Sequence, residues 1–430
     1  MGESNQELNI GDYMVGLDIG TTKISIMIGR KNQYDKLEIL GTGRAVSNGV
    51  ARGIVANIEK TVISIKEALD EAKQKSGIDI DEVFVGIAGQ HIKSLQHRGE
   101  IVRENIEVEI DKADIEKLKS NMFKLITIPG EEVIHVIPQE YTVDGEDGIQ
   151  DPKGMAGVKL EANFHVITAQ VGAVRNIMRC VEKAGLSPKE LVLEPFASAV
   201  ATLDEDELRE GVALVDIGGG TTDVAIFLDK IIRHTAVIPF GGNVITKDIK
   251  TGLSILEKQA ELLKIKFGSA MYTEDQENVM VSIPGLRGRP PKEIAVKNLS
   301  EIIGSRYKEI IDLVYHEIKV SGYENKLMTG IVLTGGGSQI RNLKQFVAFV
   351  TGKETRIGYP NEHLGSESKD KVVSPMYATG VGLVLKGFEH ADYVKTPATA
   401  IELENTIETD SDTIGVLDKI KDWFTEEDIN

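Results

Sequence analysis

Two similar loop motifs in separate halves of the chain constrain its fold more than any other feature. Residues 17–26 read LDIGTTKISI, and residues 215–226 read VDIGGGTTDVAI. Each has an apolar run that ends in Asp-Ile-Gly, then Thr-Thr, then a second apolar run, which predicts strand, tight turn and strand. Because self-similarity of this kind indicates a duplicated architecture, we expect an α/β fold with two related halves.

The residue types in these loops suit a phosphate ligand. Glycines let backbone N–H groups surround phosphate oxygens, and threonine hydroxyls and Lys23 add hydrogen bonds and charge. Asp18 and Asp216 stand at strand ends, and two carboxylates that meet across a cleft suit Mg²⁺, which takes few protein ligands and keeps several waters. The sequence therefore predicts a phosphate and magnesium site between the two halves.

A third glycine turn, Thr334 to Ser338, follows a predicted strand and opens a predicted helix within residues 331–350. Glycines at this point allow a flat base or sugar to lie against the backbone, and a helix N-terminus favours anions. Because this turn follows the two phosphate loops in the chain, we expect it to face the nucleoside of the same ligand.

Composition excludes several classes of protein. The 430 residues carry a formal charge of −18, whereas a nucleic-acid binder shows a basic patch or stripe. The single cysteine, Cys180, and the scattered histidines form no disulfide or zinc pattern. The polar N-terminus does not resemble a signal peptide, and no run approaches the roughly 18 apolar residues that span a bilayer. We expect a cytoplasmic protein that meets a membrane only at its surface.

Between the motifs, the apolar spacing predicts further elements and an insertion. Residues 90–167 differ from their surroundings by charged strand-like segments and a stretch rich in glycine and aspartate, which indicates an inserted subdomain. Its last segment, FHVITAQ, is predicted to return as a strand to the parent sheet. The acidic stretch 390–412 is predicted to be a linker, because it cannot bury enough apolar surface to fold. Helices are predicted at 57–76, 111–123, 171–184, 253–268 and 297–320.

The motifs resemble those of the actin, chaperone and sugar-kinase ATPase superfamily. The two loops are similar to its phosphate-1 and phosphate-2 motifs, and TGIVLTGGGSQI is similar to its adenosine motif. LEPFASAVATL and MYATGVGLVLKG resemble its two connecting helices, in which the pairs Ala197/Ala201 and Ala378/Gly382 would allow a close crossing. The resemblance implies an actin-like fold of two ribonuclease-H-like halves that bind ATP and Mg²⁺.

Within that superfamily the chain resembles the FtsA family of bacterial cell-division proteins. The insertion falls where that family carries subdomain 1C, PFGGNVITKDIKTGL is similar to the entry to subdomain 2B, and LSEIIGSRYKEII is similar to the helix that returns from it. An acidic linker and a terminal amphipathic helix complete the resemblance. The implied organisation is 1A (13–89 and 168–205), 1C (90–167), 2A (206–245 and 323–372), 2B (246–322), a connecting helix (373–389), the linker and the terminal helix (413–425).

The resemblance also implies roles for individual residues. Asp18 and Asp216 would flank Mg²⁺ and its waters, and Glu194 would orient the attacking water, although a helix N-terminal carboxylate favoured by the dipole is an alternative. Glu261 and Lys264 would contact the ribose, or else form a solvated helix face. The other implied ATP-binding residues are Gly20, Thr21, Thr22, Lys23, Gly218, Gly219, Gly220, Thr221, Thr222, Gly242, Gly335, Gly336 and Gly337.

The C-terminal segment predicts a helix that lies in the plane of a membrane. Its apolar residues fall within about 120° of arc on a helical wheel. Residues 414–430 contain five acids and two lysines, whereas tails of the family tend to be basic, so apolar burial must dominate lipid binding. Docking on the protein's own body or on a partner is the alternative. The predicted membrane-binding residues are Val416, Leu417, Ile420, Trp423 and Phe424.

The function implied by the family is that of an ATP-controlled scaffold. Such a protein forms filaments, hydrolyses ATP slowly at most, and tethers the tubulin-like protein FtsZ, through its C-terminal peptide, and other divisome proteins to the inner membrane at the septum. A pilus-assembly adaptor of the PilM type and a small-molecule kinase on the same fold are alternatives, and a chaperone fits least well. No nucleic-acid partner is expected.

Overall fold

The computed structural model describes residues 13–395 apart from 104–107, 126–128, 275–276, 286–289, 367 and 369–371. The chain divides into two compact units, residues 1–386 and 387–430, and all the sheets and the cleft discussed below belong to the first. The predicted terminal helix, 413–425, and most of the predicted linker lie outside the described residues.

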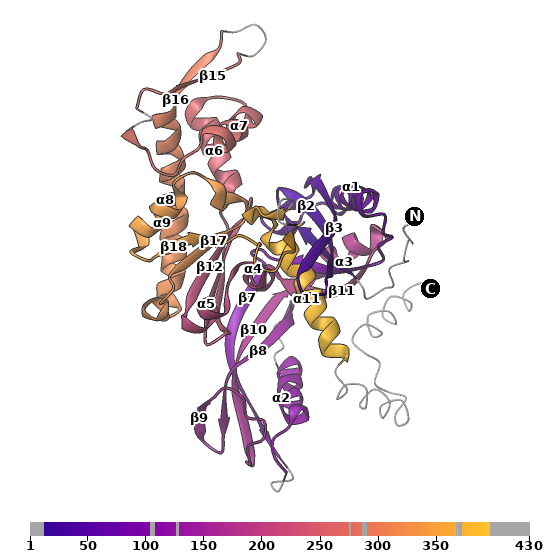
Figure 1. Cartoon of the computed structure of the whole chain (residues 1–430). Coiled ribbons are helices and arrows are strands. Elements are labelled where there is room, and N and C mark those ends of the chain that lie inside the picture. The colour runs from indigo at the N-terminus through magenta and orange to yellow at the C-terminus, as the bar shows by residue number, and fades with distance from the viewer. Residues whose placement is uncertain are drawn as a thin grey trace. The chain divides into compact units, whose positions relative to one another are not determined.

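The first half is built on a five-stranded sheet (Figure 1). A hairpin of antiparallel strands surrounds the first Asp-Ile-Gly loop, a third strand is antiparallel to it, and two more strands run parallel to the first. In spatial order the strands are β11 (Ser187–Leu193), β6 (Glu82–Ile87), β1 (Met14–Ile19), β2 (Lys23–Lys31) and β3 (Leu37–Val46). A small hairpin, β4 (Val50–Ala51) and β5 (Ile54–Val55), lies outside this sheet.

The second half repeats this arrangement strand for strand. Its sheet has the order β14 (Ile231–Ile238), β13 (Thr222–Leu228), β12 (Val212–Ile217), β17 (Ile331–Thr334) and β18 (Thr355–Ile357). β12 and β13 form the antiparallel hairpin around the second loop, β14 is antiparallel to β13, and β17 and β18 run parallel to β12. The duplicated α/β architecture predicted from the loop motifs is therefore confirmed.

Helices cover the sheets according to their apolar faces. In α1 (Ile58–Ser76) the residues Ile65, Ala68, Leu69 and Ala72 recur at helical spacing and are buried against β2 and β3. Asn57 caps this helix by accepting a hydrogen bond from the Lys60 amide, as its sequence position favours. The other helices are α3 (Val171–Lys183), α4 (Glu194–Thr202), α5 (Glu205–Glu210), α6 (Gly242–Leu253), α7 (Glu257–Phe267), α8 (Val296–Val320), α9 (Leu343–Thr351), α11 (Ala378–Lys395) and the 3-10 turns η2 (Glu324–Lys326), η3 (Gly336–Gln339) and η4 (Pro375–Tyr377).

The inserted subdomain is a four-stranded sheet with a helix, α2 (Lys112–Leu125). The order of its strands is β7 (Ile92–Val102), β10 (Lys159–Gln170), β8 (Glu131–Val143) and β9 (Glu146–Ile149). The prediction that FHVITAQ returns to the parent sheet is wrong, since it forms the end of β10 and pairs with β7 and β8. An alternating apolar pattern indicates a strand but cannot show which sheet the strand joins.

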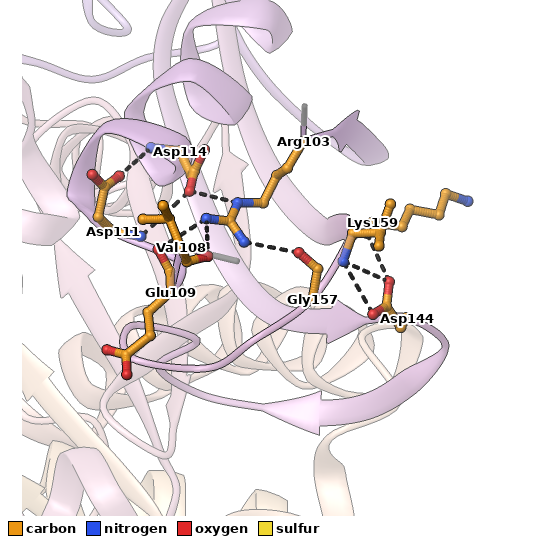
Figure 2. Close-up of polar contacts among 9 residues, drawn as sticks. Arg103, Val108, Glu109, Asp111, Asp114, Asp144, Gly157 and Lys159 are labelled. Atoms are coloured by element: carbon orange, nitrogen blue, oxygen red, sulfur yellow. Dashed lines mark hydrogen bonds and ion pairs between the residues drawn. The ribbon is translucent and has the colours of Figure 1, made fainter. Parts of the chain in front are cut away.

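A buried arginine fastens this subdomain together (Figure 2). The Arg103 guanidinium donates to Asp114 Oδ2 at 2.7 Å and to the carbonyl oxygens of Gly157, Val108 and Glu109 at 2.8–2.9 Å. Its planar fork thus joins the end of β7, the first turn of α2 and the segment before β10. This side chain therefore helps to hold α2 on the sheet, together with the buried Leu118 and Met122 of the helix.

The inserted subdomain also contacts β14, the edge strand of the second half. Gln139 and Gln96 donate side-chain amide hydrogens to the carbonyl oxygens of Ile232 and Arg233, at 2.8 and 3.3 Å. The ring of His165 lies 3.1 Å from both the Gln96 amide and the Thr235 hydroxyl. These bonds satisfy polar groups that an edge strand would otherwise expose, and they join the insertion to the second half.

Three histidines in the insertion should make the protein sensitive to acid. Burial lowers the pKa of His91, His135 and His165 from 6.5 to about 4. The folded protein favours the neutral ring, so the contribution of each histidine to the free energy of unfolding is fully present above pH 6.5. Each contribution falls by about 3 kcal/mol as the pH approaches 4. Urea unfolding across this pH window should show the loss. His91→Leu should make this loss of stability smaller, and leucine leaves no polar group unsatisfied because neither nitrogen of His91 has a hydrogen-bond partner. His97→Gln, on the exposed face, should leave the loss unchanged. Equal slopes for wild type and His91→Leu would contradict this assignment.

Three further boundaries differ from the sequence predictions. The helix predicted over 253–268 is α7 alone, because the chain turns at Ser254, whose φ is 49°, between α6 and α7. An unpredicted hairpin, β15 (Met280–Ile283) and β16 (Lys292–Ala295), precedes α8. Finally, α11 continues to Lys395, so its last residues occupy the start of the predicted linker. The predicted limits of the subdomains within each half remain predictions.

Candidate functional site

A cleft of about 560 Å³ lies between the two halves, within the usual size range of small-molecule sites. Both Asp-Ile-Gly loops, the third glycine turn and α7 contribute to its walls. Of the predicted site residues, those that line it are Asp18, Gly20, Thr21, Thr22, Lys23, Glu194, Asp216, Gly218, Gly219, Gly220, Thr221, Gly242, Glu261, Lys264, Gly335, Gly336 and Gly337.

Thr222 is the exception among the predicted residues. Its side chain is fully buried, and its hydroxyl donates to the carbonyl oxygen of Phe240 at 2.8 Å, away from the cleft. Thr222 is already the first residue of β13, where alternate side chains point to opposite faces. The predicted phosphate contact of the Thr222 hydroxyl is therefore not supported by its position.

The two phosphate-type loops approach each other closely. A Cβ atom on Gly219 would lie 1.8 Å from Thr22 Oγ1, and one on Gly220 would lie 2.5 Å from Thr21 Oγ1. Thr22 also donates to Asn243 Oδ1 at 3.3 Å. A side chain at either position would force Thr21 or Thr22 to move, so the glycines keep the two loops close and leave the backbone N–H groups of the second loop accessible.

Lys23 places its positive charge beside the first carboxylate. Its ammonium lies 3.3 Å from Asp18 Oδ2 and donates to the carbonyl oxygen of Met376 at 2.7 Å. Asp18 also accepts from Ser25 Oγ at 3.3 Å and is only 6% exposed. The lysine thus neutralises one of the buried carboxylates and ties the first loop to η4.

The second carboxylate is held by hydroxyl groups. Asp216 Oδ2 accepts from Ser198 Oγ of α4 at 2.7 Å and from Thr379 Oγ1 of α11 at 3.5 Å. Burial raises the pKa of Asp216, and Asp18 raises it further, whereas the hydrogen bond from Ser198 opposes this shift. Asp216 is therefore held in place by residues from both connecting helices.

Two more carboxylates complete an acidic cluster. Burial, followed by the charges of Asp18, Asp223 and Asp216, raises the pKa of Glu194 well above its usual value. Burial and the charge of Asp216 raise the pKa of Asp223 to about 7. Asp223 was missed by the sequence reasoning, although it follows the second loop directly. Like charges this close favour protonated forms unless a cation is present.

The acidic cluster fits a hydrated divalent cation. Asp223 Oδ1 is buried with no hydrogen-bond partner, although Oδ2 accepts from Thr221 at 3.1 Å. Within the described part of the chain, no three His, Cys, Asp or Glu side chains are arranged to enclose a metal ion directly. A cation here would therefore take most of its ligands from water and phosphate, as Mg²⁺ prefers.

The opposite end of the cleft is formed by α7 and α8. Lys264 Nζ lies 2.8 Å from Glu261 Oε2 and donates to the carbonyl oxygen of Gly242 at 2.9 Å. Tyr307 of α8 is fully buried, and its hydroxyl donates to the carbonyl oxygen of Gly337 at 2.7 Å. Glu261 and Lys264 thus belong to the cleft rather than to a solvated face, and Tyr307, which supports the glycine turn, gave no sequence signal beyond helical spacing.

The two connecting helices cross at very short range. A Cβ atom on Gly382 of α11 would lie 1.8 Å from the carbonyl oxygen of Ala197 in α4. The helix α4 itself contacts strands of both sheets, β6 and β11 on one side and β12 and β13 on the other. The small residues predicted to allow a close crossing do so at this point.

Two duplicated halves, with glycine loops facing each other across a cleft and two crossed connecting helices, define an actin-like protein. Comparison with known proteins narrows this class. The family model described as cell division protein FtsA matches residues 213–382, and that of the SHS2 domain inserted in FtsA matches residues 89–168. Cell division protein FtsA of Pseudomonas aeruginosa is 39% identical over 96% of this chain and 97% of its own length. The chain belongs to the FtsA family of cell division proteins.

Solved structures support the fold alone. The PilM–PilN type IV pilus biogenesis complex contains a chain that superposes with a TM-score of 0.62 at 18% identity, covering 87% of this chain and 98% of its own. MreB5 of Spiroplasma citri bound to ADP superposes with a TM-score of 0.53 at 15% identity, covering 89% of this chain and 98% of its own. Both have the actin-like fold. Among the described residues, no helix is long and apolar enough to cross a membrane.

Proposed function

We propose that this protein binds ATP with Mg²⁺ in the cleft and acts in cell division as a membrane-attached scaffold controlled by the nucleotide. The observation that carries the nucleotide proposal is the convergence of 17 of the 18 predicted site residues on one cleft. MreB5, which shares the fold, is bound to ADP in its solved structure, and membership of the FtsA family supports the role in cell division.

Different residues of the cleft would bind different parts of the ATP molecule. The first loop with Lys23 and the second loop would hold the phosphates, the third turn would face the adenosine, and Lys264 with Glu261 would reach the ribose. Asp18 and Asp216 would hold Mg²⁺ through water, and the bound ion would neutralise phosphate charge. Glu194 can orient a water molecule, but burial and the neighbouring carboxylates raise its pKa and so favour its protonated form, which cannot accept a proton. ATP therefore serves mainly as a conformational ligand, with slow hydrolysis at most.

The scaffold role extends beyond the cleft. The protein polymerises through subdomains 1C and 2B, binds the C-terminal peptide of FtsZ and other divisome proteins, and attaches to the cytoplasmic face of the inner membrane at the septum. The apolar residues within 413–425, which the sequence predicts to share one face of a helix, would supply the attachment. Relatives of the FtsA family that cover nearly the whole chain favour this role over a pilus adaptor or a small-molecule kinase.

One reconstitution tests the scaffold proposal. The full chain, FtsZ, lipid vesicles and Mg-ATP are combined, each is omitted in turn, and vesicles are floated through a density gradient. FtsZ should float only when both the full chain and lipid are present, and a truncation at Asp412 should abolish flotation of both proteins. Equal flotation of the truncated and full chains would reject the membrane role. Failure of the full chain to retain labelled ATP would reject the proposal that it binds nucleotide.

A further inference from the structure

We propose that Ser198 and Thr379 are positioning residues that link the magnesium-binding carboxylate Asp216 to the crossing of the two connecting helices. This inference rests on the proposed binding of Mg-ATP in the cleft. Neither residue belongs to a glycine loop, and neither was among the residues that the sequence singled out. They come from α4 and α11, helices separated by more than 170 residues of chain.

The polar atoms of the three side chains form a triangle of short distances, in which the two hydroxyl hydrogens make two hydrogen bonds at a time: Ser198 donates to Asp216, and Thr379 donates either to Ser198 or to Asp216. Ser198 Oγ lies 2.7 Å from Asp216 Oδ2 and 3.1 Å from Thr379 Oγ1, and Thr379 Oγ1 lies 3.5 Å from the same carboxylate oxygen. Ser198 is fully buried, and Thr379 and Asp216 are each 9% exposed. Thr379 and Asp216 line the cleft, whereas Ser198 stands behind them. Because water is largely excluded, these two hydroxyl donors fix where the oxygen atoms of Asp216 can point.

The triangle stands beside the point where the helices touch. Ser198 follows Ala197, whose carbonyl oxygen would lie 1.8 Å from a Cβ atom added to Gly382, and Gly382 is one helical turn from Thr379. A separation or rotation of the two helices would therefore break the bond between Ser198 and Thr379 and remove at least one donor from Asp216. Conversely, a ligand that fixes Asp216 would stabilise this crossing, since coupling between two sites is reciprocal.

A second contact attaches the start of α11 to the other phosphate loop. Lys23, which pairs with Asp18, donates to the carbonyl oxygen of Met376 in η4, three residues before Thr379. The segment from Met376 to Gly382 thus contacts Lys23 beside Asp18 in the first half and Asp216 in the second half. It also lies against the backbone of α4. The geometry makes this segment sensitive to whether the charge between Asp18 and Asp216 is balanced by a cation.

The test compares nucleotide affinity with Mg²⁺ and with EDTA, using a fluorescent ATP analogue and the full chain. Ser198→Ala and Thr379→Val should lose about tenfold to one-hundredfold of the affinity measured with Mg²⁺, the usual range for a hydrogen bond to a charged group, and little of that measured in EDTA. Thr379→Ser keeps the hydroxyl and should retain the wild-type ratio of the affinity with Mg²⁺ to the affinity in EDTA. The double variant should lose less than the product of the two single effects, because the hydroxyls share one bond.

Thr202→Val is the matched control. Thr202 is buried in the same helix, and its hydroxyl donates to the backbone carbonyl of Ser198 at 2.6 Å rather than to a carboxylate. Amide hydrogen exchange supplies a second readout. Mg-ATP should slow exchange in α4 and in the first turns of α11 in wild type and in Thr202→Val, but not in Ser198→Ala or Thr379→Val.

The outcomes separate this inference from the proposed function. If wild type binds nucleotide and the variants keep its dependence on Mg²⁺ and its exchange pattern, the positioning role is wrong. If wild type binds no nucleotide, the proposed function fails and the inference fails with it. Should Ser198→Ala not fold, Thr379→Val against Thr379→Ser decides the question, since these differ from wild type by a single group.

Discussion

Replacing Gly382 with alanine is expected to destabilise the protein by on the order of 3 kcal/mol, although alanine normally favours a helix over glycine. The added Cβ would lie 1.8 Å from the carbonyl oxygen and 2.2 Å from the carbonyl carbon of Ala197. Both are backbone atoms, so no side chain can move aside, and α4 and α11 must separate. Thermal and urea unfolding should show the loss, and nucleotide affinity should fall with it because the crossing supports Asp216.

Gly172→Ala provides the control for this prediction. Gly172 also lies in a helix, α3, but a Cβ atom there would meet nothing within 4 Å. The substitution should leave stability unchanged or raise it by up to about 1 kcal/mol. If Gly382→Ala were equally harmless, the connecting helices would not be in the close contact that the structure shows.

The duplication and the cleft could be predicted because each depends on a local pattern. The Asp-Ile-Gly loops are short, and glycine and threonine at fixed offsets report directly on backbone shape and hydrogen-bonding capacity. The pairs of small residues in the connecting helices likewise report on a close approach. These signals need no knowledge of which distant segments meet.

Features that depend on distant pairing could not be read from the sequence. The FHVITAQ strand has the same alternating pattern whichever sheet it joins, so its assignment to the parent sheet was wrong. The partner of the Thr222 hydroxyl is set by Phe240, which lies in another segment. The roles of Ser198, Thr379 and Tyr307 appear only when the helices that carry them are placed beside the glycine loops.

Replacing Gly335 with alanine is expected to abolish tight nucleotide binding, with a loss of affinity of at least about one-hundredfold, or close to 3 kcal/mol. The Cβ atom would lie 2.2 Å from Asp216 Oδ1 and 2.6 Å from the carbonyl oxygen of Ile217. The backbone at Gly335 has a φ of 81°, which adds about 1–2 kcal/mol of strain for any L-residue. The substitution therefore displaces either the third glycine turn or Asp216, the carboxylate proposed to face Mg²⁺.

A control with the same backbone strain distinguishes the site effect from simple destabilisation. Gly322 has a φ of 77°, and a Cβ atom there would meet nothing within 4 Å. Gly322→Ala should lose about 1–2 kcal/mol of stability and keep wild-type nucleotide affinity, because the strain is then remote from the cleft. Titration of a fluorescent ATP analogue into both variants, at a temperature where circular dichroism shows both folded, measures the difference. Unaltered affinity in folded Gly335→Ala would show that the third turn and Asp216 do not bind the nucleotide together.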